Sequence, residues 1–355
     1  MALLKRHPFI AAMLKLSIKT WVLVLSLAIA LTVVSFILVG ALGFADKYYH
    51  VAGDETSMNK ILSIKVSGVI VGDSDEGFAE GFGVVPGYAI KQQLYKAADD
   101  DAIQGVVLEI NSPGGTIYGA HAIADGVAHY REKAKRPVYA HVQGVGASGA
   151  YWAAISADKV ITDYGSDVGS IGVIMGPFKY YDKVLSEDGK VLTQNGIESY
   201  NITAGKSKDA GDPYRKLTPD EIATLQRSVN NEYDEFVKYV HERRKIPEDV
   251  IRDKLGALTY DAKTAKEEKM IDDTMGREET YKALAEASRI GDDYEVVRPI
   301  VLDETARYQG GGWLGTVLHR GPKPASMAQA SRCDLDRVTL AFNGDLSTLC
   351  RDANK

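Results

Sequence analysis

The chain has 355 residues, which is enough for one large α/β domain with appendages or for two smaller domains. Its net charge of −6 and the absence of a long basic run argue against nucleic acid as the main partner. The only two cysteines, Cys333 and Cys350, are too few and too late in the chain to build a metal centre with a core, so we expect no metal and no other cofactor.

The N-terminal segment predicts a membrane anchor. Residues 20–45 carry no charged side chain, and this run is longer than the ~20 apolar residues with which a helix crosses a bilayer. Four cations and no acidic residue precede it, namely Lys5, Arg6, Lys15 and Lys19. The positive-inside rule keeps residues 1–19 in the cytoplasm and predicts a single-pass protein of the cell membrane whose main domain is extracytoplasmic. A cleaved signal peptide is the alternative, but its apolar core is usually only ~7–15 residues long.

The segment after the anchor predicts a stalk, followed by alternating strands and helices. Residues 46–60 are polar, and the globular domain, 61–300, opens with an alternating strand at 61–70. A loop rich in glycine and acidic residues follows at 71–87, and its length indicates an insertion or a lid. The next predicted elements are helices at 88–101, at 117–133 and from 150 onwards, and strands at 105–110, 138–142 and 159–162. This alternation predicts right-handed βαβ units around a mostly parallel sheet, and therefore an α/β fold.

The second half of the domain is predicted to be largely helical. Thr218, Pro219 and Glu221 form a strong helix start, because they supply an N-cap, a proline at the first position and a capping box. Apolar residues at spacings of three and four continue this amphipathic helix to about 243–245. Shorter helices at 247–255, 261–269 and 278–288 and a last strand at 294–301 follow. Residues 301–355 read as a linker and tail, in which we expect either a disulfide between Cys333 and Cys350 or disorder.

Two glycine-rich turns follow neighbouring predicted strands. One lies at 111–115, and the other, at 144–149, carries Ser148. Ligands bind at the carboxyl ends of the strands in parallel sheets, so both turns lie at the edge that is expected to be functional. A serine on a sharp strand-to-helix turn is presented as a nucleophile, and flanking glycines let a substrate approach. A plain turn whose serine caps the next helix is the alternative.

A serine nucleophile needs a base, since its hydroxyl is protonated at neutral pH. The chain has seven histidines, but none is predicted in a loop at this edge of the sheet. A lysine whose pKa is lowered by burial is the other solution, and Lys206 and Lys208 are candidates, although a solvated loop is the plainer interpretation of their segment. Backbone N–H groups of Gly114 and Gly149 could form an oxyanion hole, and Ser170 could hydrogen-bond the neutral lysine.

Four motifs occur in order at 111–115, 146–149, 169–175 and 205–209, with further matches at 260–262 and 271–273. In this order and spacing they resemble the signal peptide peptidase A family of bacterial membrane-bound serine proteases over roughly residues 60–285. The resemblance implies a Clp-protease/crotonase-like α/β fold of repeated ββα units with C-terminal helices. It also implies a homo-oligomeric ring or dome that cleaves leftover signal peptides at the lipid bilayer. The single set of motifs indicates the short form of the family, with one catalytic domain per chain.

The resemblance also implies residue roles. Ser148 is the nucleophile and Lys208 the general base, with Lys206 as a fallback. Gly114 and Gly149 match the oxyanion positions, and Ser170 matches the residue that orients the lysine. A crotonase-like enzyme acting on acyl-CoA and a non-catalytic oligomeric membrane scaffold are the alternative functions. The sequence leaves open the number of subunits, the substrate preference and whether the serine and the lysine of one site belong to one chain or to two.

Overall fold

The computed structural model describes residues 8–43, 47–73, 83–180 and 202–300. The predicted tail at 301–355, with its two cysteines, and the middle of the predicted insertion loop lie outside the described residues. The chain divides into two compact units, Met1–Tyr49 and His50–Lys355.

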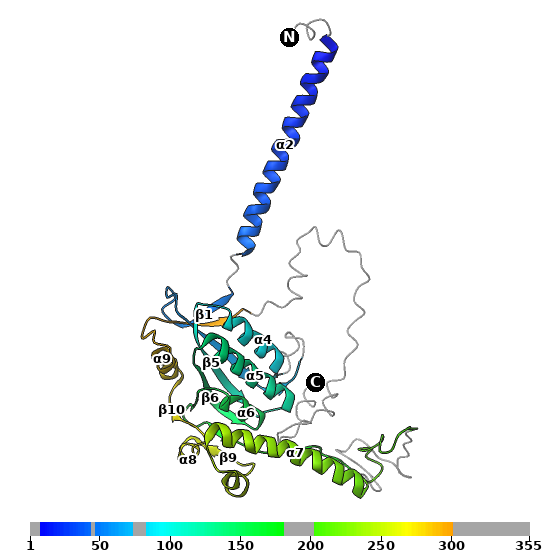
Figure 1. The fold of residues 1–355 in the computed structure, drawn as a ribbon, viewed down its shortest axis with the longest axis vertical. Coiled ribbons are helices and arrows are strands. Elements are labelled where there is room, and N and C mark those ends of the chain that lie inside the picture. Colours follow the sequence, from blue (N-terminus) through cyan, green and yellow to red (C-terminus); the bar gives the residue numbers. More distant parts are fainter. Residues whose placement is uncertain (1–7, 44–46, 74–82, 181–201, 301–355) are drawn as a thin grey trace, which may run out of the picture. The chain divides into compact units, whose positions relative to one another are not determined.

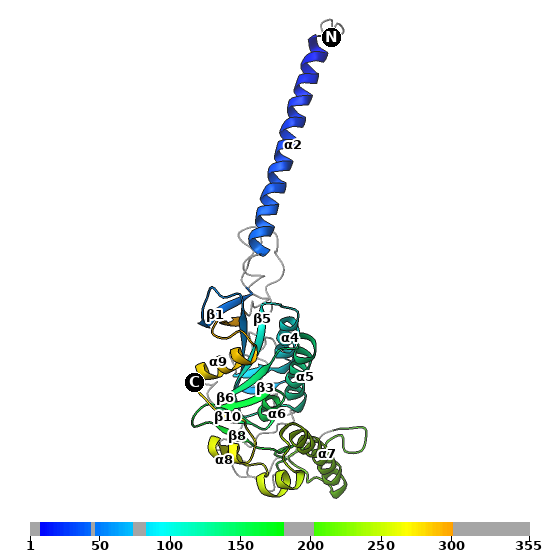
Figure 2. The same ribbon diagram turned by 60° about the vertical axis from the view of Figure 1, so that its left-hand side comes forward.

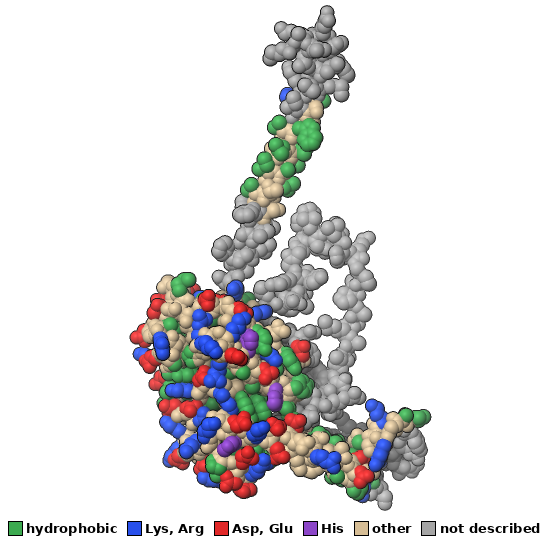
Figure 3. Space-filling model, viewed as in Figure 1, with side chains coloured by type: hydrophobic (Ala, Val, Ile, Leu, Met, Phe, Trp, Pro, Cys, Tyr) green, Lys and Arg blue, Asp and Glu red, His purple; other side chains and the backbone are tan. Residues whose placement is uncertain are grey.

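The N-terminal unit contains one helix, α2 (Pro8–Gly43), over the predicted anchor and the residues before it. Its described apolar side chains are exposed, Trp21 by 72% and Leu23 by 69%, and Figure 3 shows green side chains along the described part of the helix. Among the described residues, no helix is both long enough and apolar enough to pass through a membrane. The anchor at 20–45 therefore stays a prediction.

A nine-stranded sheet forms the centre of the second unit, in the order β1-β11-β2-β5-β6-β7-β10, with β8 beside β6 and β9 beside β8. The described pairs are parallel except β8 with β9, so the predicted α/β fold with a mostly parallel sheet is confirmed. The strands are β1 (Tyr48–Gly53), β2 (Lys60–Ser67), β5 (Ile103–Ser112), β6 (Val138–Ala147), β7 (Lys159–Thr162), β8 (Asp167–Gly169), β9 (Thr259–Asp261), β10 (Asp273–Thr274) and β11 (Glu295–Pro299). Outside this sheet, β3 (Val69–Val71) and β4 (Val84–Pro86) form a separate parallel pair.

Helices cover both faces of the sheet (Figures 1 and 2). Two of them, α4 (Gly87–Ala98) and α5 (Ile117–Ala134), lie on one face, and α9 (Arg277–Ala287) lies on the other. Tyr281 and Leu284 of α9 pack against Ile61, Val107 and Tyr139, which come from three adjacent strands. These side chains alternate with residues that face the opposite side, as expected for strands buried between two helical layers.

The expectations that differ from the structure include the following. Gln143–Ala147, expected in a turn, continues β6 because Val145 to Ala147 pair with β8, a strand that the sequence pattern did not reveal. The polar segment 46–60, expected as a stalk, contains β1, and its last residue begins β2. The predicted helix at 247–255 is a π-helix, η1 (Val250–Leu255), in which Gly256 N donates to Ile251 O at 2.8 Å.

Two helices link the sheet edge to the C-terminal region. The first, α6 (Gly149–Ile155), is fully buried, and the second, α7 (Pro219–Arg244), starts at the predicted capping box of Thr218 and Glu221. Only the second half of α7 packs on α6, where the Trp152 ring stacks on Tyr239 with the ring centres 4.4 Å apart. In the first half of α7 the apolar residues stay wholly or partly exposed, and Ile222 is exposed by 52%.

Candidate active site

The carboxyl ends of three strands meet around Ser148. In the register of the sheet, Ser112 of β5 pairs with Gly146, and Gly169 of β8 pairs with Ala147. The chain after β5 therefore lies on one side of Ser148, and Ser170 lies on the other. The predicted meeting of both glycine-rich turns at one edge is confirmed.

Ser148 has the backbone of a presented nucleophile. Its φ of 54° and ψ of −122° lie in a region that non-glycine residues rarely adopt, which costs on the order of 1–3 kcal/mol. The surrounding structure holds this conformation, with Ser148 N donating to Gly169 O at 2.7 Å. The side chain is fully buried, and among the described residues its Oγ has no hydrogen-bond partner. It makes no capping bond to α6, so the alternative of a plain helix cap is not supported.

Glycine backbone lies directly against Ser148, as predicted. The hydrogen bonds of the glycine amides, however, distinguish Gly114 from Gly115. A Cβ added to Gly114 would lie 2.9 Å from both Ser148 Cβ and Gly149 N, so this position requires glycine. The N–H of Gly114 already donates to Ser112 Oγ at 3.1 Å. Among the described residues, the N–H of Gly115 makes no such bond. Its nitrogen lies 3.4 Å from the point where a Cβ added to Gly149 would lie. The geometry thus favours Gly115, in place of the predicted Gly114, as the partner of Gly149.

Ser170 directly follows Gly169, whose carbonyl accepts a hydrogen bond from Ser148 N, and its predicted role of orienting the lysine stays a prediction. Its φ is 53°, and its N–H donates to Leu258 O at 2.7 Å, which fixes the turn after β8. Sequence reasoning could not show that this turn depends on a residue almost ninety positions later.

The structure does not bring Lys208 to Ser148 within one chain. Lys208 is exposed, in a segment that is tied to the first turn of α7 through Lys206 Nζ and Asp220 Oδ2, 3.3 Å apart. Between Pro219 and Phe236, which contacts the Trp152 ring of α6, the helix rises roughly 25 Å. Figures 1 and 2 show the segment before α7 at the end of this helix that is remote from α6.

An ion-pair network fixes the lysine-bearing segment to α7. Arg215 Nη2 lies 2.8 Å from both Asp209 Oδ1 and Glu221 Oε1. Hydrogen bonds from Arg215, and then the bond from the Thr218 backbone, hold the pKa of the Glu221 carboxyl well below its usual range. The pKa of Asp209 is lowered mainly by its own bond to Arg215. The segment is therefore a fixed extension of α7 at neutral pH.

Three of the described histidines contact backbone carbonyl oxygens or an aromatic ring. His141 is buried in β6 with Nε2 3.1 Å from Met275 O, and burial lowers its pKa. The His121 ring contacts the Trp152 ring, with the ring centres 4.3 Å apart and the planes tilted by 31°, and His241 Nδ1 lies 2.8 Å from Ile246 O. Within the described part of the chain, no group of three or more histidine, cysteine or acidic side chains could hold a metal ion.

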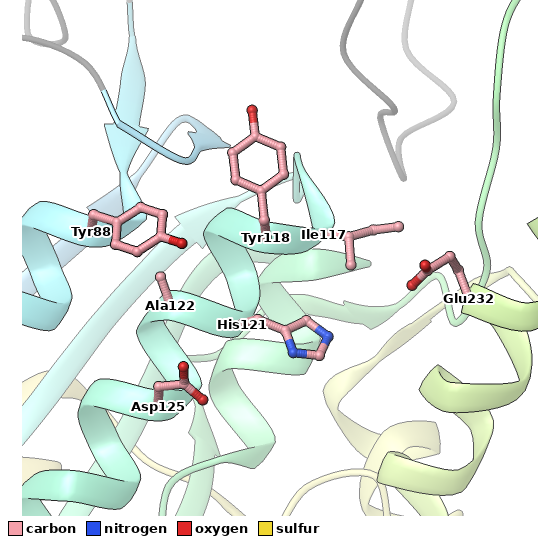
Figure 4. A pocket seen from close by; sticks show the side chains of 7 residues that line it. All are labelled: Tyr88, Ile117, Tyr118, His121, Ala122, Asp125 and Glu232. Carbon is pink, nitrogen blue, oxygen red and sulfur yellow. The ribbon is translucent and has the colours of Figure 1, made fainter. Parts of the chain in front are cut away.

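A cavity of about 480 Å³ opens beside the first turn of α5, three residues after Gly114 (Figure 4). Its lining combines apolar, aromatic and acidic side chains and comprises Tyr88, Ile117, Tyr118, His121, Ala122, Asp125 and Glu232. Asp125 is paired with Lys91 at 3.1 Å. Figure 4 shows Glu232 of α7 across the cavity from Tyr88. Sequence reasoning missed this cavity because its walls come from three helices.

Comparisons with known proteins agree with this geometry. Residues 130–291 match peptidase family S49, and residues 87–162 match Clp protease. The chain is 34% identical to "Putative protease MJ0651" of Methanocaldococcus jannaschii over 54% of this chain and 58% of the relative. It is 29% identical to "Putative signal peptide peptidase SppA" of Enterococcus faecium over 66% of each. It is 30% identical to "Protease 4" of Haemophilus influenzae over 53% of this chain and 28% of the relative.

The chain thus spans about two thirds or less of the length of these relatives. The two family matches together include the strand ends that meet at Ser148, the glycines beside it and the segment of Lys208. The resemblance found in the sequence is therefore confirmed: the chain is similar to peptidase family S49 over residues 130–291, to Clp protease over residues 87–162, and to relatives named as signal peptide peptidase and as protease.

Proposed function

We propose that this protein is a membrane-anchored serine endopeptidase that cleaves apolar peptides, including remnants of signal peptides, through an acyl-enzyme on Ser148. The proposal rests on the backbone conformation of Ser148 and on its hydroxyl group, which is free among the described residues. Ser148 is held at positive φ where three strand ends meet, and its Oγ is uncommitted beside backbone amides. The match to peptidase family S49 supports peptide hydrolysis, and the name of the Enterococcus relative supports the substrate class.

In the proposed reaction, Ser148 Oγ attacks the carbonyl carbon of the scissile peptide bond while a neutral lysine takes the hydroxyl proton. The carbonyl oxygen becomes an oxyanion that accepts hydrogen bonds from the amides of Gly115 and Gly149, where charge develops. The carbon–nitrogen bond then breaks, and the lysine returns the proton to the leaving amine. Water, deprotonated by the same lysine, hydrolyses the ester and restores the serine.

We assign the lysine to Lys208, supplied by a second copy of the chain. Within one chain, Lys208 lies at the far end of α7, whereas a base must come within ~2.6–3.2 Å of the hydroxyl. The first half of α7 carries Ile222, Leu225, Val229 and Tyr233 at helical spacing, and these side chains are exposed or partly so. A helix of this kind buries its apolar stripe against a partner. A homo-oligomer would cover this stripe and complete the Ser/Lys dyad in one step.

The cavity beside α5 supports a peptide substrate. It is within the size range of ligand sites and begins at Ile117, two residues after Gly115, so side chains next to the scissile bond would reach it. The anchor proposal rests on the uncharged run at 20–45 and the cations before it. With residues 1–19 in the cytoplasm, the catalytic domain would lie outside the cell membrane.

The experiment is covalent labelling of the full chain with a fluorophosphonate probe, together with cleavage of an apolar peptide with a quenched fluorophore. We expect labelling and cleavage by the wild type. Ser148→Ala should abolish both, and Lys208→Ala should lower cleavage by at least ~10³-fold, as for loss of a general base. Lys206→Ala, two residues away, is the matched control and should retain cleavage.

Each alternative gives a different result. An unlabelled wild-type protein that still assembles would indicate the non-catalytic scaffold. Saturable binding of acyl-CoA without peptide cleavage would indicate the crotonase-like enzyme. Normal cleavage by Ser148→Ala or by Lys208→Ala would remove that residue from the dyad.

A further inference from the structure

A second cavity, of about 440 Å³, lies at the end of α7 and is strongly basic. Its lining comprises Arg243, Arg244, Lys266, Lys269, Ile271 and Asp272. Four cations and one carboxylate are thus gathered in a chain whose net charge is −6. The lining comes from the last turn of α7 and from α8 (Ala262–Glu267) with the residues after it. Nothing in the proposed peptidase reaction uses these side chains.

Arg243 is held rigidly without being neutralised. Its Nε donates to Ile155 O, and its Nη2 donates to Ser156 O and Ala157 O, each at 2.7 Å. These carbonyl oxygens, at the C-terminal end of α6, fix the plane of the guanidinium but carry only partial charges. Among the described residues, Nη1 makes no hydrogen bond. The group is therefore a positioned cation with two unused N–H donors.

Arg244 is fixed in the same way on the other wall. Its Nε donates to Lys269 O, and its Nη1 to Asp272 Oδ2, both at 2.9 Å, and its side chain is only 11% exposed. The same Asp272 oxygen accepts from Val160 N at 2.7 Å. The one carboxylate of the lining is thus engaged by Arg244 and by the sheet. Nη2 of Arg244 has no partner among the described residues.

The charge balance indicates the ligand. Lys266 pairs with Asp273, whereas Lys269 has no ion pair or side-chain hydrogen bond within the described part of the chain. With Asp272 and Asp273 set against the four cations, two positive charges remain. A carboxylate would neutralise one of them, whereas a phosphate dianion would neutralise both. Guanidinium forks and ammonium groups are the usual ligands of phosphate oxygens.

We propose that this basic pocket binds a phosphate group, either as free phosphate or as the phosphomonoester headgroup of a lipid. Arg243 Nη1, Arg244 Nη2 and Lys269 Nζ are the donors. A purely structural role accounts for the bonds of Arg243 and Arg244 to backbone carbonyls, but it does not involve the Lys269 ammonium. Replacing Lys269 therefore distinguishes phosphate binding from a purely structural role. The replacement leaves the hydrogen bonds of Arg243 and Arg244 to the backbone intact.

The test is calorimetric titration of inorganic phosphate into the full-length, detergent-solubilised protein at constant ionic strength, with chloride as the competing anion and at a pH where phosphate is mainly dianionic. Lys269→Gln should weaken phosphate binding by about tenfold, as expected for one lost charge-assisted hydrogen bond. Lys263→Gln removes an exposed lysine of α8 outside the pocket and should change the affinity less than twofold.

Titration of a short-chain phosphatidic acid identifies the source of the phosphate. Tighter binding than that of inorganic phosphate, lost equally in Lys269→Gln, would assign the site to a lipid headgroup, whereas equal affinity would assign it to free phosphate. The proposal would be overturned by a wild type that shows no saturable binding of either probe. It would equally be overturned if Lys269→Gln and Lys263→Gln weakened binding to the same extent. Thermal unfolding of each variant checks that the fold is intact.

Discussion

The backbone of Ser148 predicts an unusual order of stability for two inactive variants. At φ 54° and ψ −122°, any residue with a Cβ is strained by on the order of 1–3 kcal/mol, whereas glycine is not. Glycine also loses more conformational entropy on folding, which offsets about 0.5–1 kcal/mol of this gain. Ser148→Gly should therefore be more stable than Ser148→Ala by about 1 kcal/mol. Both variants lack the hydroxyl, and they differ by the buried Cβ and by the backbone freedom that its removal gives.

The assay is equilibrium unfolding in urea, at one protein concentration and in one detergent, with the free energy of unfolding extrapolated to water. Ala153→Gly, in the middle of the same helix, is the control and should lose about 1 kcal/mol or more, because its backbone is helical. If Ser148→Gly also loses stability relative to Ser148→Ala, the serine is not held in a strained conformation and the reasoning about its presentation fails.

Two further predictions concern buried groups behind the site. Glu109 accepts hydrogen bonds from Tyr281, Ser63 and Arg298. Because Glu109→Gln leaves the Arg298 charge uncompensated, it should lower the free energy of unfolding in urea by roughly 3 kcal/mol. A loss below about 1 kcal/mol would contradict this. Burial lowers the pKa of His141 below its usual 6.5, so the unfolded chain binds the proton more readily and stability falls as the pH drops below about that value. The wild type should therefore lose more stability between neutral and mildly acidic pH than His141→Gln, as measured by thermal unfolding; parallel curves would contradict this.

Local signals made much of the fold predictable. The capping box of Thr218 and Glu221 lies within one turn, and the structure shows both of its hydrogen bonds. The alternation of buried strands and amphipathic helices around β5, α5 and β6 was likewise visible, because each element carries its own hydrophobic period. Ser148 could be singled out because the residues flanking its turn reveal both the strand and the helix.

The remaining features depend on distant partners. The extension of β6 through Ala147 requires β8, which is too short to show a pattern of its own. The choice between Gly114 and Gly115 depends on whether the Ser112 hydroxyl captures an amide, and a motif does not encode that geometry. The separation of Lys208 from Ser148 follows from the direction in which α7 leaves α6, and Trp152 and the residues around it set that direction. Tertiary packing therefore decides these features, and sequence spacing does not.

The central claim is that Ser148 and a lysine from a second copy form one active site. Ser148→Ala and Lys208→Ala are each expected to be inactive, and the direct measurement is peptide cleavage by an oligomer assembled from equal amounts of the two. With random assembly, about a quarter of the sites would combine an intact serine with an intact lysine, so cleavage should return to about 25% of the wild-type rate. Lys208→Ala mixed with a chain carrying both substitutions should stay inactive. Absence of recovery in the first mixture, in oligomers shown to contain both chains, would contradict the account.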